Sequence, residues 1–96
     1  MMVVGLLQLD LHLPMAASLK DKRSVLKSVK DQLRGRFNVA VAEFDANDKW
    51  QRAFLGVATV GCDRQSVDDC LRRVTDCVRD HRLVSLVHIE QEVTHV

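Results

Sequence analysis

The chain has 96 residues, 47% hydrophobic and 28% charged, a balance typical of one soluble globular domain spanning residues 1–96. Its 14 basic and 13 acidic residues give a net charge of +1, which argues against a protein that coats DNA but permits a local basic patch. No apolar run reaches the roughly 20 residues that span a bilayer. Three cysteines without CxxC spacing indicate reduced thiols, so we expect a cytoplasmic protein with no membrane partner.

Residues Val3 to Leu13 alternate between apolar and polar side chains and predict a half-buried first strand. The leucines of this run share one face, and Gln8, Asp10 and His12 share the other. These polar residues also interrupt the apolar N-terminal run, which lacks a basic n-region, so we expect no signal peptide. Pro14 cannot donate a ladder hydrogen bond and ends the strand.

The next segment predicts a helix that is capped by Ser18 and stops at Gly35. The Ser18 hydroxyl can accept a free backbone N–H of the first turn, and Asp21 follows three residues later, as in a loose capping box. Apolar residues then recur at helical spacing and fall on one face. They are Leu19, Leu26, Val29 and Leu33.

The same helix concentrates positive charge. From Lys20 to Arg36 there are seven basic residues and two acids, which gives this segment a net charge of +5. Because the whole chain has a net charge of +1, the rest of the chain carries −4. The basic residues are Lys20, Lys22, Arg23, Lys27, Lys30, Arg34 and Arg36. All but Lys22 and Arg36 form one stripe beside the apolar face, and Lys22 projects toward that face. The stripe is either a solvated helix face or a strip that binds an anion, for which RNA phosphate is the natural large ligand.

A hairpin follows the helix. Phe37 to Phe44 predicts the second strand and Arg52 to Gly61 the third, because both alternate. The segment from Asp45 to Asp48 is rich in turn formers and joins the two strands.

A second helix and a last strand complete the chain. Asp63 can cap a helix from Arg64 to about Asp80, and Leu83 to Val93 alternates as a strand. The order is therefore β-α-β-β-α-β. With right-handed crossovers this predicts an α+β fold, the ferredoxin-like plait, whose four-stranded antiparallel sheet has the order 4-1-3-2 with both helices on one face.

This fold leaves one sheet face open, and the residues predicted there are too apolar for a bare surface. Its candidate interface residues are Leu6, Phe44, Phe54 and Leu86, with Trp50 at the end of the hairpin. We expect homodimerisation or partner docking on this face. Trp50 lies between Lys49 and Arg52, where its indole either caps the sheet end, stacks on a base or anchors a partner.

Four polar residues of the first and last strands suggest a different function, a small metal-dependent or ligand-binding enzyme. Asp10, His12, His88 and Glu90 share the predicted open face. Any alternating strand supplies their spacing of two residues, however, so we expect no metal or other cofactor. The chain lacks a GxSxG motif and a glycine-rich phosphate loop, and we predict no catalytic residue. Base stacking on the sheet is also disfavoured, because Phe54 is the one aromatic of the central strands.

Several local motifs are specific in combination. They are Leu19-Lys20-Asp21-Lys22-Arg23, Arg36-Phe37-Asn38-Val39, Ala42-Glu43 and Trp50-Gln51-Arg52-Ala53. With these motifs nearly the whole chain resembles the YlxP-like family of small bacterial proteins, a domain of unknown function. Ala40, where the family pattern often has serine, is a mild departure. The resemblance implies a ferredoxin-like fold, a cytoplasmic bacterial protein and an association with translation, because relatives are often encoded beside initiation-factor and ribosome-maturation genes. It implies no enzymatic residues.

We therefore expect a non-enzymatic module that contacts RNA or a ribosomal particle through the basic stripe and dimerises through the open sheet face. The first alternative is a structural or protein-interaction homodimer whose stripe is only solvated. The second alternative is the small enzyme described above.

Overall fold

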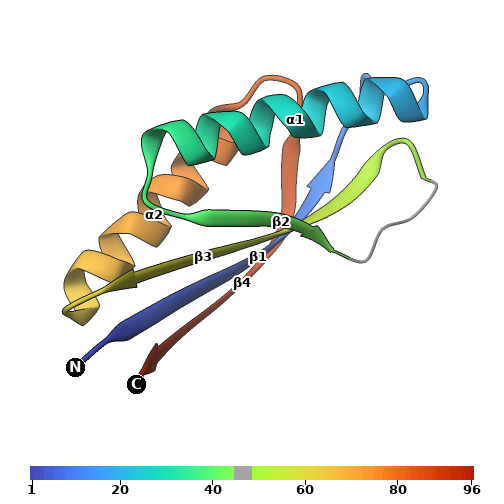
Figure 1. Ribbon diagram of the computed structural model, residues 1–96. Coiled ribbons are helices and arrows are strands. Elements are labelled where there is room, and N and C mark those ends of the chain that lie inside the picture. Colours follow the sequence, from blue (N-terminus) through green and yellow to red (C-terminus); the bar gives the residue numbers. More distant parts are fainter. Residues whose placement is uncertain (45–48) are drawn as a thin grey trace.

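The computed structural model describes residues 1–44 and 49–96 and confirms the predicted order of elements (Figure 1). They are β1 (Val3–His12), α1 (Leu19–Arg36), β2 (Ala40–Phe44), β3 (Arg52–Gly61), α2 (Arg64–Asp80) and β4 (Ser85–His95). The strands form one antiparallel sheet in the order β2-β3-β1-β4, and both helices cover the same face. The ferredoxin-like plait is therefore confirmed. The turn predicted at Asp45 to Asp48 lies outside the described residues.

The core fills the space between the sheet and the helices. Leu9 and Leu11 of β1, Leu33 of α1 and Leu71 of α2 are all fully buried. Helix α2 lies close on the sheet because Gly5 of β1 has no side chain. None of the helices in the described part of the chain is long and apolar enough to cross a membrane.

Several element boundaries differ from those predicted. Strand β4 runs from Ser85 to His95 rather than from Leu83 to Val93, and β1 ends at His12 rather than Leu13. Helix α1 continues through Gly35, and the N–H of Phe37 caps it by donating to the Leu33 carbonyl at 3.0 Å. Strand β2 begins at Ala40 rather than Phe37. In the preceding segment the carbonyl of Asn38 accepts a hydrogen bond from the hydroxyl of Thr59 at 2.8 Å, and the backbone pairing with β3 begins only at Ala40. Apolar alternation continues through this connector without strand pairing, which is why the sequence overestimated β2.

A register shift in β4 overturns one interface prediction. Asp10 pairs with His88, but the next residue of β1, Leu11, pairs with Leu86, so β4 holds one extra residue at Val87. Because side chains alternate between faces, the extra residue reverses the facing of all residues before it. Leu86 consequently packs against the core, and Val84 is buried. The prediction that Leu86 lies on the open face is wrong.

Candidate nucleic-acid interface

The start of α1 is held by reciprocal capping. The Ser18 hydroxyl accepts from the backbone N–H of Asp21 at 3.0 Å, and the Asp21 carboxylate accepts from the N–H of Ala17 at 2.9 Å. The first bond satisfies one free donor of the first turn, the second satisfies the N–H of the residue before the cap, and together they place an acid at the positive helix end. The helical phase of the cations that follow is therefore set from the first turn.

Five cations share the flank of α1 that faces β2. Arg34 shows the direction, because its guanidinium donates to the Val41 carbonyl of β2 at 2.6 Å. The other four lie on the same flank by helical spacing. We call this set the basic flank: Lys20, Arg23, Lys27, Lys30 and Arg34. All are exposed except Lys30, which is half-buried.

The basic flank keeps most of its charge. Lys27 pairs with Asp31 at 2.6 Å, and this is the flank's one ion pair within the described ranges. The hydrogen bond from Lys27 and the charges of Lys27, Arg34 and Lys30 hold the pKa of Asp31 below its ordinary value of 3.8. Both side chains of this pair are largely exposed, so water screens the pair and a competing anion can displace Asp31 at little cost.

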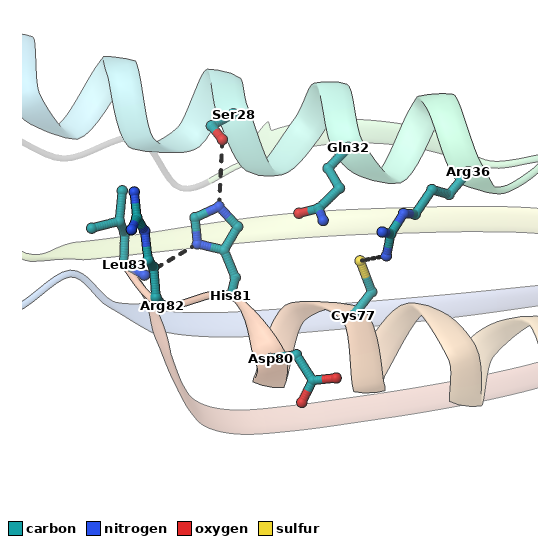
Figure 2. Close-up of a pocket in the computed structure, with 8 residues that line it drawn as sticks. All are labelled: Ser28, Gln32, Arg36, Cys77, Asp80, His81, Arg82 and Leu83. Atoms are coloured by element: carbon teal, nitrogen blue, oxygen red, sulfur yellow. Dashed lines mark hydrogen bonds between the residues drawn. The ribbon is translucent and has the colours of Figure 1, made fainter.

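The two remaining predicted cations lie elsewhere. Lys22 is only 3% exposed, and its ammonium donates to the Lys49 carbonyl at 2.9 Å, which ties the hairpin to α1. Arg36 projects from the opposite flank of α1 toward α2, where its guanidinium lies 3.7 Å from the sulfur of Cys77 (Figure 2). The structure thus brings five of the seven predicted contact residues together and separates two.

Between the helices lies a polar cleft of about 570 Å³, lined on the α1 side by Ser28, Gln32 and Arg36 (Figure 2). From the end of α2, the Nδ1 of His81 accepts the backbone N–H of Leu83 at 3.2 Å. A neutral imidazole then carries its hydrogen on Nε2, which lies 3.4 Å from the Ser28 hydroxyl. Burial, with the charge of Arg82, lowers the pKa of His81 below 6.5 and favours this neutral form. His81, to which the sequence assigned no role, therefore links the two helices.

The open sheet face divides into an apolar half and an acidic half. Leu6 and Phe44 are 39% and 37% exposed, and a shallow groove of about 370 Å³ lies between them. The groove exists because the residues that floor it are small: Ala40, Ala42, Gly56 and Ala58. Phe54 packs beside Phe44 with ring centroids 5.9 Å apart. Toward β4 the face carries Glu90 and Glu92, opposite Gln8 and Leu6.

Three of the four residues of the enzyme alternative, Asp10, His88 and Glu90, line one small hollow on the open face, and His12 lies apart from them. Both oxygens of Asp10 accept from the guanidinium of Arg52, at 2.8 to 3.2 Å. His88 lies 3.6 Å from Glu90, whereas His12 pairs across the sheet with Ser85 and Arg52. In residues 1–44 and 49–96 no three His, Cys, Asp or Glu side chains are placed to share a metal ion.

The cysteines are unpaired. Cys62 is exposed, Cys70 is half-buried and Cys77 is buried. The thiol of Cys70 lies 3.8 Å from the Thr59 hydroxyl, and that of Cys77 faces Arg36. Cys77 therefore lies in the core, whereas Cys62 lies at the surface.

Comparison with known proteins gives a family. Residues 4–91 match the family described as "Protein of unknown function (DUF503)". The chain is also 35% identical over 72 residues to the uncharacterized protein YlxP of Bacillus subtilis (strain 168), a match that covers 75% of this chain and 78% of that protein. Among solved structures, the chain is similar to two crystal structures of SnoaB, a cofactor-independent oxygenase from Streptomyces nogalater. Each match has 13% sequence identity and covers 99% of this chain and 92% of the SnoaB chain, with TM-scores of 0.47 and 0.48. That likeness is too low to bear on function. The chain belongs to the YlxP-like DUF503 family, which its sequence motifs had indicated.

Proposed function

We propose that this protein is a non-enzymatic cytoplasmic module that binds RNA or a ribonucleoprotein through the basic flank. The observation that carries the proposal is the alignment of five cations along a single capped helix, of which, in residues 1–44 and 49–96, only Lys27 is in an ion pair. From Lys20 to Arg34 the row is about 21 Å long, which matches several consecutive phosphates of one strand. A role in translation or ribosome maturation is what the family resemblance implies.

The charge distribution supports an approach from the helix side. Glu90 and Glu92 on the open sheet face would repel phosphate, whereas the basic flank attracts it. Glu43 is the acid of β2 nearest this flank by strand alternation, and it makes no ion pair in the part of the chain described. Contacts of this kind position a backbone and carry little sequence information, so we expect weak sequence preference.

The test is RNA binding measured by fluorescence anisotropy across a range of salt concentrations. Each phosphate contact contributes about 0.7 to the slope of log affinity against log salt for a single strand. The variant Lys27→Gln/Lys30→Gln should therefore bind more weakly, with a slope that is less steep by about 1.4. Its matched control is Arg73→Gln/Arg79→Gln, which removes the same charge from exposed positions of α2.

Two results would contradict the proposal. The first is a wild-type protein that does not retain RNA at low salt. The second is an equal loss of affinity in the α2 control, which would show that net charge matters and its position on α1 does not.

A second candidate function is self-association through the open sheet face. The apolar groove and the exposed Leu6, Phe44 and Val60 favour it. A pairing that laid β4 on β4 of the other copy would oppose Glu90 and Glu92 to like charges, so the two copies should meet through their apolar halves. Light scattering at high concentration should give a dimer that Phe44→Asp dissociates. A monomeric wild type would refute this function.

A further inference from the structure

The residues on both sides of Trp50 are held by hydrogen bonds to earlier parts of the chain. The carbonyl of Gln51 accepts the N–H of Leu13 at 2.9 Å, and the Gln51 amide donates to the carbonyls of Pro14 and Ala16 at 3.2 and 3.4 Å. On the other side the carbonyl of Lys49 accepts the buried ammonium of Lys22. The start of β3 is thus attached to the segment that enters α1 and to the first turn of α1.

The indole itself is left open to solvent. Trp50 is 51% exposed, and nowhere in the described structure does its ring pack on another aromatic or its N–H find a hydrogen-bond partner. The sheet aromatics differ, because Phe44 and Phe54 pack on each other and Arg52 lies 5.8 Å from the centre of the Phe54 ring. About half of the Trp50 surface therefore remains accessible to a ligand.

The fastening ties the backbone next to Trp50 to the first turn of α1, which is the end of the helix where the basic flank begins. Lys22 lies between Lys20 and Arg23 in the first turns of α1, and it is Lys22 that holds the residue before Trp50. An RNA strand whose phosphates follow the basic flank toward the N-terminus of α1 therefore runs toward the end of the helix to which the Trp50 backbone is tied. The ordering of such an aromatic costs little entropy, because its main chain is already held.

We propose that Trp50 stacks on an unpaired base of this RNA, so that the ligand is single-stranded or looped RNA and not a duplex. The inference rests on the proposed function of the basic flank. Bases in a duplex are already stacked and hidden, whereas those of single strands and loops can be splayed onto an aromatic ring. Every base offers a π-face, so the contact adds affinity without adding much sequence preference.

The test uses Trp50 as its own reporter, because the chain has one tryptophan. Wild-type protein is titrated with a mixed-sequence 12-mer RNA and with the blunt duplex of the same sequence, each about twice the length of the flank, so that one molecule can reach the flank and extend beyond it. The single strand should quench the tryptophan fluorescence and the duplex should not. Trp50→Ala should lose about 5- to 150-fold in affinity for the single strand, the range known for one stacked base, while its affinity for the duplex is unchanged.

The salt dependence separates stacking from charge. Trp50→Ala removes no cation, so its salt slope should equal that of the wild type, whereas Lys27→Gln/Lys30→Gln should flatten the slope. Trp50→Phe should recover part of the affinity. The quenching measurement uses the wild-type protein, so it still tests the inference if Trp50→Ala misfolds.

Two outcomes overturn the inference. In the first, Lys27→Gln/Lys30→Gln weakens RNA binding, but the single strand does not quench the Trp50 fluorescence and Trp50→Ala binds it as tightly as the wild type does. Stacking is then refuted and the proposed function stands. If the wild type retains no RNA at low salt, both fail together. In that case a lower assembly mass for Trp50→Ala would identify the indole as an anchor for a protein.

Discussion

The close approach of α2 to Gly5 of β1 makes Gly5→Ala an informative test of the packing. A methyl group at Gly5 would lie 2.6 Å from Cγ1 of Val67 and 2.9 Å from Cδ1 of Leu71. Carbon atoms pack best at about 3.5–4.0 Å, so the first contact is roughly 1 Å too short. Val67 cannot rotate away easily, because β-branched side chains in helices have one strongly preferred rotamer. Helix α2 would have to move away from the sheet.

The expected cost follows from two opposing effects. Overpacking a core by one methyl group destabilises it by about 1–3 kcal/mol. Replacing glycine by alanine stabilises the folded state by about 0.4–1 kcal/mol where the backbone is unstrained, because it restricts the unfolded chain. We therefore expect a net loss of about 1–2 kcal/mol in the free energy of unfolding and a fall of about 5–15 °C in Tm.

The assay is urea and thermal unfolding followed by circular dichroism, with Gly56→Ala as the matched control. Gly56 lies in the neighbouring strand β3, and a methyl group there would make an ordinary contact of 3.6 Å with the ring of Phe44. Gly56→Ala should be neutral or slightly stabilising. In a Val67→Ala background, Gly5→Ala should cost much less than in the wild type. Equal stability of Gly5→Ala and Gly56→Ala would refute the reasoning.

Two further predictions concern α1 and the end of α2. Arg34→Ala should lower the free energy of unfolding by about 0.5–1.5 kcal/mol and increase aggregation, because the Val41 carbonyl on the β2 edge loses its donor. Urea unfolding and light scattering measure both effects, and an Arg36→Ala protein that aggregates equally would count against an edge effect. Because the folded pKa of His81 lies below 6.5, the unfolded chain binds more protons, and stability should fall as the pH drops through 6.5 and level off below the folded pKa. Urea titrations over about pH 5 to 8 should show a shallower fall in His81→Gln, and an unchanged pH slope would be incompatible with this account.

Features that depend on neighbours along the chain could be predicted from the sequence. Ser18 and Asp63 cap the two helices, each accepting the N–H three residues ahead, because capping involves a single turn. The leucines of β1 alternate into the core as their spacing indicated. With the order of elements and the handedness of crossovers, these local signals were sufficient for the ferredoxin-like fold and for the alignment of the basic flank.

Features that depend on how distant segments meet came only from the tertiary structure. Leu86 faces the core because of one extra residue in β4, which exists only relative to the pairing with β1. Lys22 is buried, and its ammonium donates to the carbonyl of Lys49, 27 residues along the chain. The guanidinium of Arg36 contacts the sulfur of Cys77 on α2. Trp50 is positioned by contacts with two earlier segments. Periodicity along one element sets which side chains share a face, but register and packing between elements determine which of those side chains remain available to a ligand.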